Sequence, residues 1–204
     1  MLNAGVLDDT GTTRDGFQIH FGINYMSHAL FLKLLLPTLL STATLPGSDV
    51  RVVSLTANAF RMHPESGIEF ENLKSAHEGA GLFGGFVLYG QSKLAVLLQG
   101  KELARRYPQL TSVIVHPHRS NTGLISNLPF WKKTLVWIGS FGDMASVEVG
   151  AMTQIWAAVG KEVENGIYYE SNPGAKGALE NASEDQDLSK KLWEWTENEL
   201  KRFE

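Results

Sequence analysis

Tyr89 and Lys93 are the two residues of this 204-residue chain whose types and spacing point most directly to chemistry. They stand four positions apart in a segment with helical periodicity, so both side chains would project from one helix face. A phenol with a pKa of about 10 exchanges protons poorly at neutral pH, but a nearby cation favours the phenolate. The pair could therefore exchange a proton with a carbonyl or alcohol oxygen, although the same spacing is common on helix surfaces without function.

These two residues need a scaffold, and the surrounding sequence alternates helical patterns with short apolar runs. Apolar residues recur at three- and four-residue spacing in segments 13–43, 89–107 and 143–160 and again after Ser183, which predicts helices. The runs 51–56, 110–115 and 166–170 are typical of buried strands, and residues 61–86 are typical of a loop. This order predicts one α/β domain over residues 1–204, with a doubly wound parallel sheet in a three-layer α/β/α arrangement.

Small and polar residues follow the ends of the expected strands. They are Asn3, Ala4 and Gly5 near the start, Thr56 and Ala57 after the run at 51–56, and His116 and Pro117 after the run at 110–115. In an open α/β sheet, ligands bind outside the carboxyl ends of the strands. We therefore expect the ligand to lie beside these residues.

Composition excludes several classes of protein. Hydrophobic residues make up 43% of the chain and charged residues 20%, a balance typical of a soluble globular protein. The net charge of −4 argues against nucleic acid as a partner. The sequence has no cysteine, which excludes disulfides and thiolate zinc sites, and its six histidines show no metal-ligand spacing, so no metal is expected.

The sequence shows neither a secretory signal nor a clear membrane span. Residues 1–11 lack the basic flank and apolar stretch of a signal peptide. The longest apolar run, 29–40, is interrupted by Lys33 and Pro37 and is shorter than the roughly 20 residues that cross a bilayer. We therefore expect a cytoplasmic protein in which this run forms a buried helix.

Four motifs in a fixed order resemble the short-chain dehydrogenase/reductase family, most closely its retinol-dehydrogenase-like members. The motifs are Asn3-Ala-Gly5, the segment 21–28 with Asn24, Tyr89-Gly-Gln-Ser-Lys93, and His116-Pro117 followed by Thr122. The resemblance implies a Rossmann-like fold and an NAD(P)(H)-dependent oxidoreductase that interconverts an alcohol and a carbonyl by direct hydride transfer. It further implies a fairly apolar small-molecule substrate, and NADP is expected slightly ahead of NAD.

The resemblance also assigns roles to individual residues. Tyr89 matches the catalytic acid/base, and Lys93 matches the residue that binds the nicotinamide ribose and lowers the pKa of the tyrosine. Asn24 matches the asparagine that holds a water in a relay to the lysine, and Thr122 matches the residue that hydrogen-bonds the nicotinamide carboxamide. The cofactor-binding set that the resemblance implies is Asn3, Ala4, Gly5, Tyr89, Lys93, Pro117 and Thr122.

Three departures from the family pattern favour a second hypothesis, a non-enzymatic binding or interaction protein on the same scaffold. Ala57 stands where the family has its catalytic serine, and His118 stands where it has a glycine. Thr56 carries a hydroxyl beside Ala57, but neighbours on an extended segment point to opposite faces, so Thr56 is only a weak candidate for positioning substrate. The third departure is that the family's strand, glycine-rich turn and helix that grip the cofactor pyrophosphate are missing. Residues 79–84 fit G-x-G-x-x-G but follow no apolar strand, which predicts a flexible loop rather than a phosphate site.

The start of the chain is expected to lack the glycine-rich βαβ half that binds the cofactor pyrophosphate in the family. The strand edge at Met1 and Leu2 would then be open, and an open edge pairs readily with other chains. A homo-oligomer, another polypeptide or a longer form of this chain could cover it. The aromatic and lysine-rich segment 129–137 is expected to be a substrate lid rather than a membrane contact.

Overall fold

The computed structural model describes residues 1–7, 11–76, 81–117 and 145–203 of the chain. Within these residues a parallel sheet has the strand order β1-β2-β3, with β1 at Arg51–Leu55, β2 at Thr111–Val115 and β3 at Tyr168–Tyr169. Strand β1 pairs with β2 in register from Arg51 opposite Thr111 to Leu55 opposite Val115. Leu2 forms a parallel bridge to Ser54, so the first residues run beside β1. The predicted parallel sheet is confirmed.

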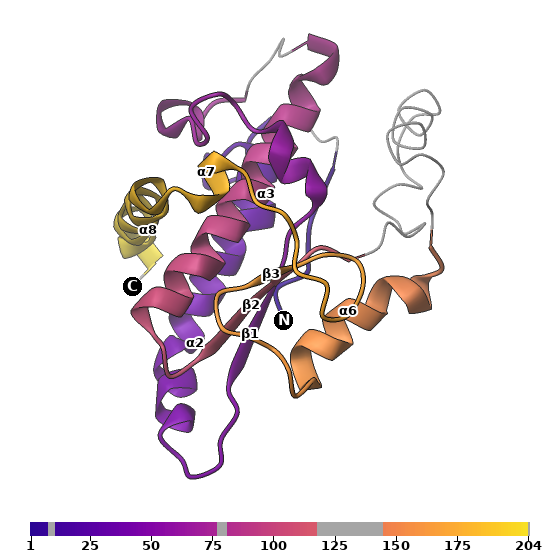
Figure 1. The fold of residues 1–204 in the computed structure, drawn as a ribbon. Coiled ribbons are helices and arrows are strands. Elements are labelled where there is room, and N and C mark those ends of the chain that lie inside the picture. Colours follow the sequence, from indigo (N-terminus) through magenta and orange to yellow (C-terminus); the bar gives the residue numbers. More distant parts are fainter. Residues whose placement is uncertain (8–10, 77–80, 118–144, 204) are drawn as a thin grey trace.

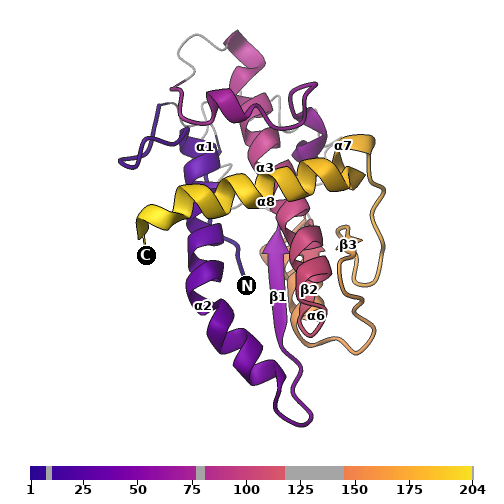
Figure 2. The same cartoon turned by 90° about the vertical axis from the view of Figure 1, so that its left-hand side faces the viewer.

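Helices cover both faces of this sheet, which confirms the predicted three-layer α/β/α arrangement (Figure 1). Helices α2 (Ser27–Ala43), α3 (Gly81–Arg106) and α8 (Gln186–Leu200) lie on one side, and α6 (Val147–Val159) lies on the other. Helix α8 crosses over α3 on the outside (Figure 2). The shorter elements are α1 (Ile19–Phe21), α7 (Asn181–Glu184), a π-helical turn at Gly22–Met26 and 3₁₀ turns at Asn58–Met62, Phe70–Asn72 and Lys201–Phe203.

Both faces of the strands contribute to the core, which explains their nearly continuous apolar sequence. Ile114 packs in a cluster with Phe21 and Leu97 of the helical layer, whereas Val113 packs with Ala157 of α6. Strands β1 and β2 are buried from their second residue onward. A parallel sheet covered on both sides requires this pattern.

The helical stretch before β1 differs from the prediction of a buried helix. It runs from Ile19 to Ala43 and is long and apolar enough to cross a membrane, although only 22% of its most apolar window is buried. The buried residues of α2 are His28, Ala29 and Leu32, whereas Leu34 is 64% exposed. The prediction is wrong for the second half of α2, because that half extends past the place where α8 crosses it (Figure 2).

Two boundaries also differ from the sequence prediction. Helix α3 begins at Gly81, so the loop expected up to residue 86 is helical in its last part. Glycine disfavours a helix interior by about 1 kcal/mol, but extending an existing helix needs no new nucleation. The final helix α8 is capped by Asp185, whose side chain accepts from Leu188 N, whereas Ser183 closes the turn of α7.

Candidate active site

Helix α3 places Tyr89 and Lys93 on one buried face, as their spacing predicts. Lys93 Nζ lies 5.7 Å from the centroid of the Tyr89 ring, and the two residues are 6% and 7% exposed respectively. Lys93 Nζ donates a hydrogen bond of 3.1 Å to Leu55 O at the end of β1. Burial lowers the pKa of Lys93 to about 8. The site therefore holds an ammonium whose charge the surrounding protein solvates poorly.

Asn24 lies in the π-helical turn, and its side chain is fully buried. Its Oδ1 accepts from Val6 N at 2.7 Å, and its Nδ2 donates to Val6 O at 3.1 Å. The same Nδ2 donates to Ser92 Oγ at 3.0 Å. The amide of Asn24 thus joins the segment that follows Leu2 to the helix turn between Tyr89 and Lys93.

Gly5 lies against both polar side chains. A Cβ built on Gly5 would stand 3.1 Å from Asn24 Oδ1 and 3.7 Å from Lys93 Nζ. The structure therefore brings Gly5, Asn24, Tyr89 and Lys93 together from separate segments. Asn3 and Ala4 precede this point and are exposed.

The expected site residues that follow β1 and β2 are Thr56, Ala57 and Pro117. Thr56 is 3% exposed, and its Oγ1 donates to Lys93 O at 2.7 Å. Its hydroxyl therefore braces β1 against α3. Ala57 has extended backbone, is half-buried and precedes the 3₁₀ turn at Asn58–Met62. Pro117 is half-buried after β2, while His118 and Thr122 lie outside the described residues.

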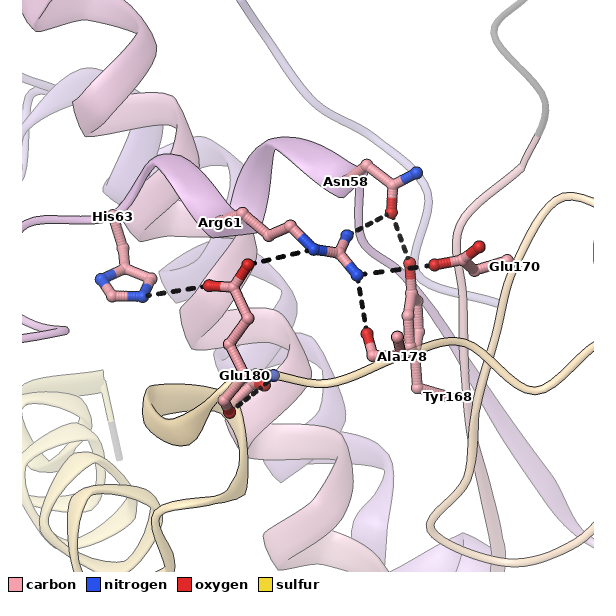
Figure 3. A network of polar contacts seen from close by, with 8 residues as sticks. Asn58, Arg61, His63, Tyr168, Glu170, Ala178 and Glu180 are labelled. Atoms are coloured by element: carbon pink, nitrogen blue, oxygen red, sulfur yellow. Dashed lines mark hydrogen bonds and ion pairs between the residues drawn. The ribbon is translucent and has the colours of Figure 1, made fainter.

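A polar network fastens the turn after Ala57 to the C-terminal part of the chain (Figure 3). Arg61 donates to Asn58 Oδ1 at 2.8 Å and to Ala178 O at 2.7 Å. Its guanidinium also lies 3.1 Å from a carboxylate oxygen of Glu180 and 3.6 Å from one of Glu170. This turn packs on α3 so closely that a Cβ at position 90 would stand 2.5 Å from Ala59 O. The network therefore supports the segment that lies next to Tyr89.

Sequence reasoning missed several residues around the site. Ser92 is fully buried and bonded to Asn24, and His20 lies edge-on to Tyr89 with ring centroids 6.1 Å apart. His28 is 9% exposed, and its pKa is lowered mainly by burial and also by the charge of Lys93. A polar residue one helical turn after Tyr89 was the available signal for Ser92. The histidines carried no such signal in the sequence.

In the described part of the chain, potential metal ligands do not cluster. Among these residues, no group of three or more histidine, cysteine, aspartate or glutamate side chains is arranged to hold a metal ion. The polar groups that do converge are the ammonium of Lys93, the phenol of Tyr89 and the amide of Asn24. Their chemistry is that of proton transfer and hydrogen bonding.

Comparison with curated proteins identifies relatives along most of the chain. An uncharacterised oxidoreductase of Schizosaccharomyces pombe is 36% identical over 193 residues, which cover 90% of this chain and 56% of the relative. A short-chain dehydrogenase/reductase of Emericella nidulans is 31% identical over 98% of this chain and 65% of the relative. Retinol dehydrogenase 14 of Mus musculus is 32% identical over 96% of this chain and 56% of the relative. The chain thus spans between half and two thirds of the length of these proteins.

Solved structures share the fold. An uncharacterised protein from Mycobacterium paratuberculosis matches 98% of this chain and 65% of its own, with a TM-score of 0.70 and 23% identity. A short-chain dehydrogenase/reductase from Saccharomyces cerevisiae matches 84% of this chain and 64% of its own, with a TM-score of 0.55 and 19% identity. No protein-family model matches the sequence.

The fold, the arrangement of Tyr89, Lys93 and Asn24 and these relatives define one class of protein. The chain belongs to the short-chain dehydrogenase/reductase family, and its curated relatives include a retinol dehydrogenase. The resemblance found in the sequence is confirmed.

Proposed function

We propose that this chain carries the acid/base part of an NAD(P)(H)-dependent oxidoreductase that interconverts an alcohol and a carbonyl. The observation that supports it most directly is the buried pair of Tyr89 and Lys93, with Lys93 Nζ 5.7 Å from the phenol ring. Two ionisable groups are costly to bury without a task, and perturbed groups of this kind concentrate at functional sites. The family of the chain supports the same reaction class.

The residues present suit a nicotinamide ribose. The ammonium of Lys93 has three N–H donors, and Leu55 O accepts one hydrogen bond from it. The missing side chain of Gly5 keeps the backbone close to Lys93 Nζ and Asn24 Oδ1, where a Cβ would fill the space. Asn3, Ala4, Pro117 and Thr122 complete the proposed cofactor set. When bound, the nicotinamide would supply the hydride.

Each residue of the pair has a distinct task in this reaction. Tyr89 donates its phenolic proton to the carbonyl oxygen during reduction and takes a proton from the alcohol during oxidation. Lys93 stabilises the resulting phenolate by its positive charge, and with a pKa of about 8 it is mostly protonated at neutral pH. Asn24, whose side chain is held by Val6 and Ser92, would hold a water in a relay to Lys93.

The variant Tyr89→Phe tests this proposal. It removes the proton donor and keeps the ring, so we expect at least a hundredfold loss of turnover with nearly unchanged affinity for NADH and NADPH. Tyr107→Phe is the matched control, because Tyr107 lies just after the C-terminal end of α3 and its ring lies tilted against that of Trp193, with ring centroids 6.3 Å apart. Turnover of Tyr89→Phe at the level of Tyr107→Phe would contradict the proposal.

The second hypothesis is a binding or interaction protein that has lost catalysis. Ala57 favours it, since alanine donates no hydrogen bond, and the Thr56 hydroxyl is already bonded to Lys93 O. Losing one donor to a developing oxyanion typically costs about 10² to 10³ in rate. Two measurements separate the hypotheses. A rise in turnover of roughly tenfold or more in Ala57→Ser supports an impaired enzyme. Absence of NADH and NADPH binding to the unmodified chain in a fluorescence titration supports the binding protein.

The finer features remain predictions of the same proposal. They are a fairly apolar small-molecule substrate, a slight preference for NADP, a cytoplasmic location, and a homo-oligomer or second chain that covers the N-terminal strand edge at Met1 and Leu2. A competition titration of NADPH against NADH measures the cofactor preference directly.

A further inference from the structure

The residues that follow the carboxyl end of β1 differ in what they can donate to a ligand. Thr56 donates its hydroxyl proton to Lys93 O at 2.7 Å, so that donor is engaged. Ala57, at the position of the family's catalytic serine, has no side-chain donor. Asn58 begins the 3₁₀ turn, is half-buried and carries an amide with two N–H donors. Because ligands bind outside the carboxyl ends of parallel strands, Asn58 lies in the region where a substrate is expected.

Two neighbours fix the direction of the Asn58 amide (Figure 3). Its Oδ1 accepts from Arg61 Nη1 at 2.8 Å and from the hydroxyl of Tyr168 at 2.8 Å. A guanidinium has no acceptor, so only the oxygen of the amide can face Arg61. The NH₂ group therefore points away from both partners, and among the described residues none accepts a hydrogen bond from it. A donor that is oriented before a ligand binds is the kind that stabilises a developing oxyanion.

The turn that carries Asn58 packs on the part of α3 that carries Tyr89. A Cβ at Gly90 would stand 2.5 Å from Ala59 O and 2.9 Å from the carbonyl carbon of Met62. The backbone of the turn therefore lies directly against the residue that follows Tyr89. The phenol of Tyr89 and the amide of Asn58 thus come from two segments that are in contact.

We propose that Asn58 supplies, in place of the family's serine, the N–H that hydrogen-bonds the oxygen of the substrate carbonyl or alcohol. This assignment rests on the proposed oxidoreductase function and deepens it. During reduction the carbonyl oxygen gains negative charge and receives the phenolic proton of Tyr89, and the N–H of Asn58 stabilises that charge. Arg61 and Tyr168 are positioning residues that act through the amide of Asn58.

The first test is a titration of the unmodified, ¹⁵N-labelled chain with decanamide, whose carbonyl oxygen is an acceptor like that of an aldehyde. The side-chain NH₂ signals of Asn58 and Asn165 are assigned by their loss in Asn58→Asp and Asn165→Asp. We expect the Asn58 signals to move downfield and those of Asn165, whose Oδ1 accepts from Ser112 N near the start of β2, to stay in place. Asn58 signals that stay unchanged with and without NADPH, or that move no more than those of Asn165, would overturn the proposal.

The second test compares the turnover of the same two variants with NADPH and decanal. Asn58→Asp keeps an oxygen for Arg61 and Tyr168 but removes the N–H, so we expect kcat to fall about a hundredfold with KM within about threefold. Asn165→Asp keeps the acceptor for Ser112 N and should retain the turnover of the unmodified chain. Equal turnover of the two variants would contradict the role of Asn58.

The substitution Ala57→Ser provides the rescue. Added to Asn58→Asp, it should restore turnover at least tenfold, a larger factor than it gives in the unmodified chain, because the two donors would serve the same oxygen. Equal factors in both backgrounds would contradict the proposal. If the unmodified chain shows no turnover, the oxidoreductase function fails for this chain, and the decanamide titration alone decides the role of Asn58.

Discussion

Asn24 and Arg61 each fasten one segment of the site to a distant part of the molecule, but they do so in different surroundings. Asn24 is uncharged, fully buried and bonded to Val6 and Ser92. Arg61 is charged, and its side chain is 30% exposed beside two carboxylates that are 37% and 42% exposed. Water can replace the hydrogen-bond partners of Arg61 but not those of Asn24. Removing the Asn24 side chain should therefore lower the free energy of unfolding much more than removing that of Arg61.

The two regions also join different parts of the chain. The Asn24 region joins the first residues to α3 and borders the buried ammonium of Lys93. The Arg61 network joins the turn after β1 to residues near Glu180 (Figure 3). Neutral, buried hydrogen bonds thus hold the Asn24 region, whereas partly exposed hydrogen bonds and ion pairs hold the Arg61 network.

The largest expected effect is that of Asn24→Ala. It leaves the N–H and C=O of Val6 without their side-chain partners, and we expect it to lower the free energy of unfolding by about 4 kcal/mol. Urea unfolding measures the change. Asn198→Ala, an exposed position on α8, is the control and should stay within about 0.5 kcal/mol of the parent. A similar small change for both variants would remove the contrast between the regions.

The next effect is the pH dependence that Lys93 confers. Its pKa falls from 10.5 to about 8 on folding, so between these values the unfolded chain binds more protons than the folded one. The free energy of unfolding should therefore rise with pH across this window, by about 3 kcal/mol in total, and the full penalty applies below about pH 8.

Lys93→Met should abolish this slope and stabilise the chain at pH 7. Lys190→Met, at an exposed position of α8, should leave the slope in place. Unfolding curves recorded from pH 7 to about pH 10 give the comparison. A slope that persists in Lys93→Met would show that another group causes it.

A smaller effect is expected from Arg61→Ala. The variant removes the hydrogen bonds of a half-exposed guanidinium to Asn58 and Ala178, and we expect the free energy of unfolding to fall by about 1 kcal/mol. Added salt should reduce the electrostatic part of this loss, because exposed charges are screened. A loss as large as that of Asn24→Ala, independent of salt, would place Arg61 in the same class as the buried amide.

The smallest effect should come from Glu180→Gln. The side chain of Glu180 is 42% exposed and lies 3.1 Å from Arg61 Nε. Replacing an exposed carboxylate by an amide keeps an acceptor for Arg61, so a change of only a few tenths of a kcal/mol is expected. Thermal unfolding at low and high salt measures it, and a loss above about 1 kcal/mol would contradict this ranking.

Much of the fold follows from local patterns. The spacing of apolar residues predicts α3, α6 and α8, and the β-branched runs predict β1 and β2, because these patterns reflect periodicities of the backbone itself. The same periodicity places Tyr89 and Lys93 on one face. The buried helix expected over residues 29–40 fails, since apolarity alone does not say which face another element covers.

The candidate site was predictable only in part. Tyr89, Lys93 and Asn24 could be named from their motifs, but the bond from Asn24 to Ser92 spans 68 residues and that from Arg61 to Ala178 spans 117. The π-helical turn around Asn24 left no clear signal in the sequence either. Such contacts depend on how the elements assemble.

The sequence by itself determined the elements and the spacing of the residues that could do chemistry, because backbone periodicity acts over a few residues. The tertiary structure decided the environment of those residues. It buried Lys93 against Leu55, placed the amide of Asn24 between Val6 and Ser92, and left Arg61 half-exposed beside Glu180. Desolvation and hydrogen-bond direction arise only when distant segments meet, so the chemistry of each group is set by folding.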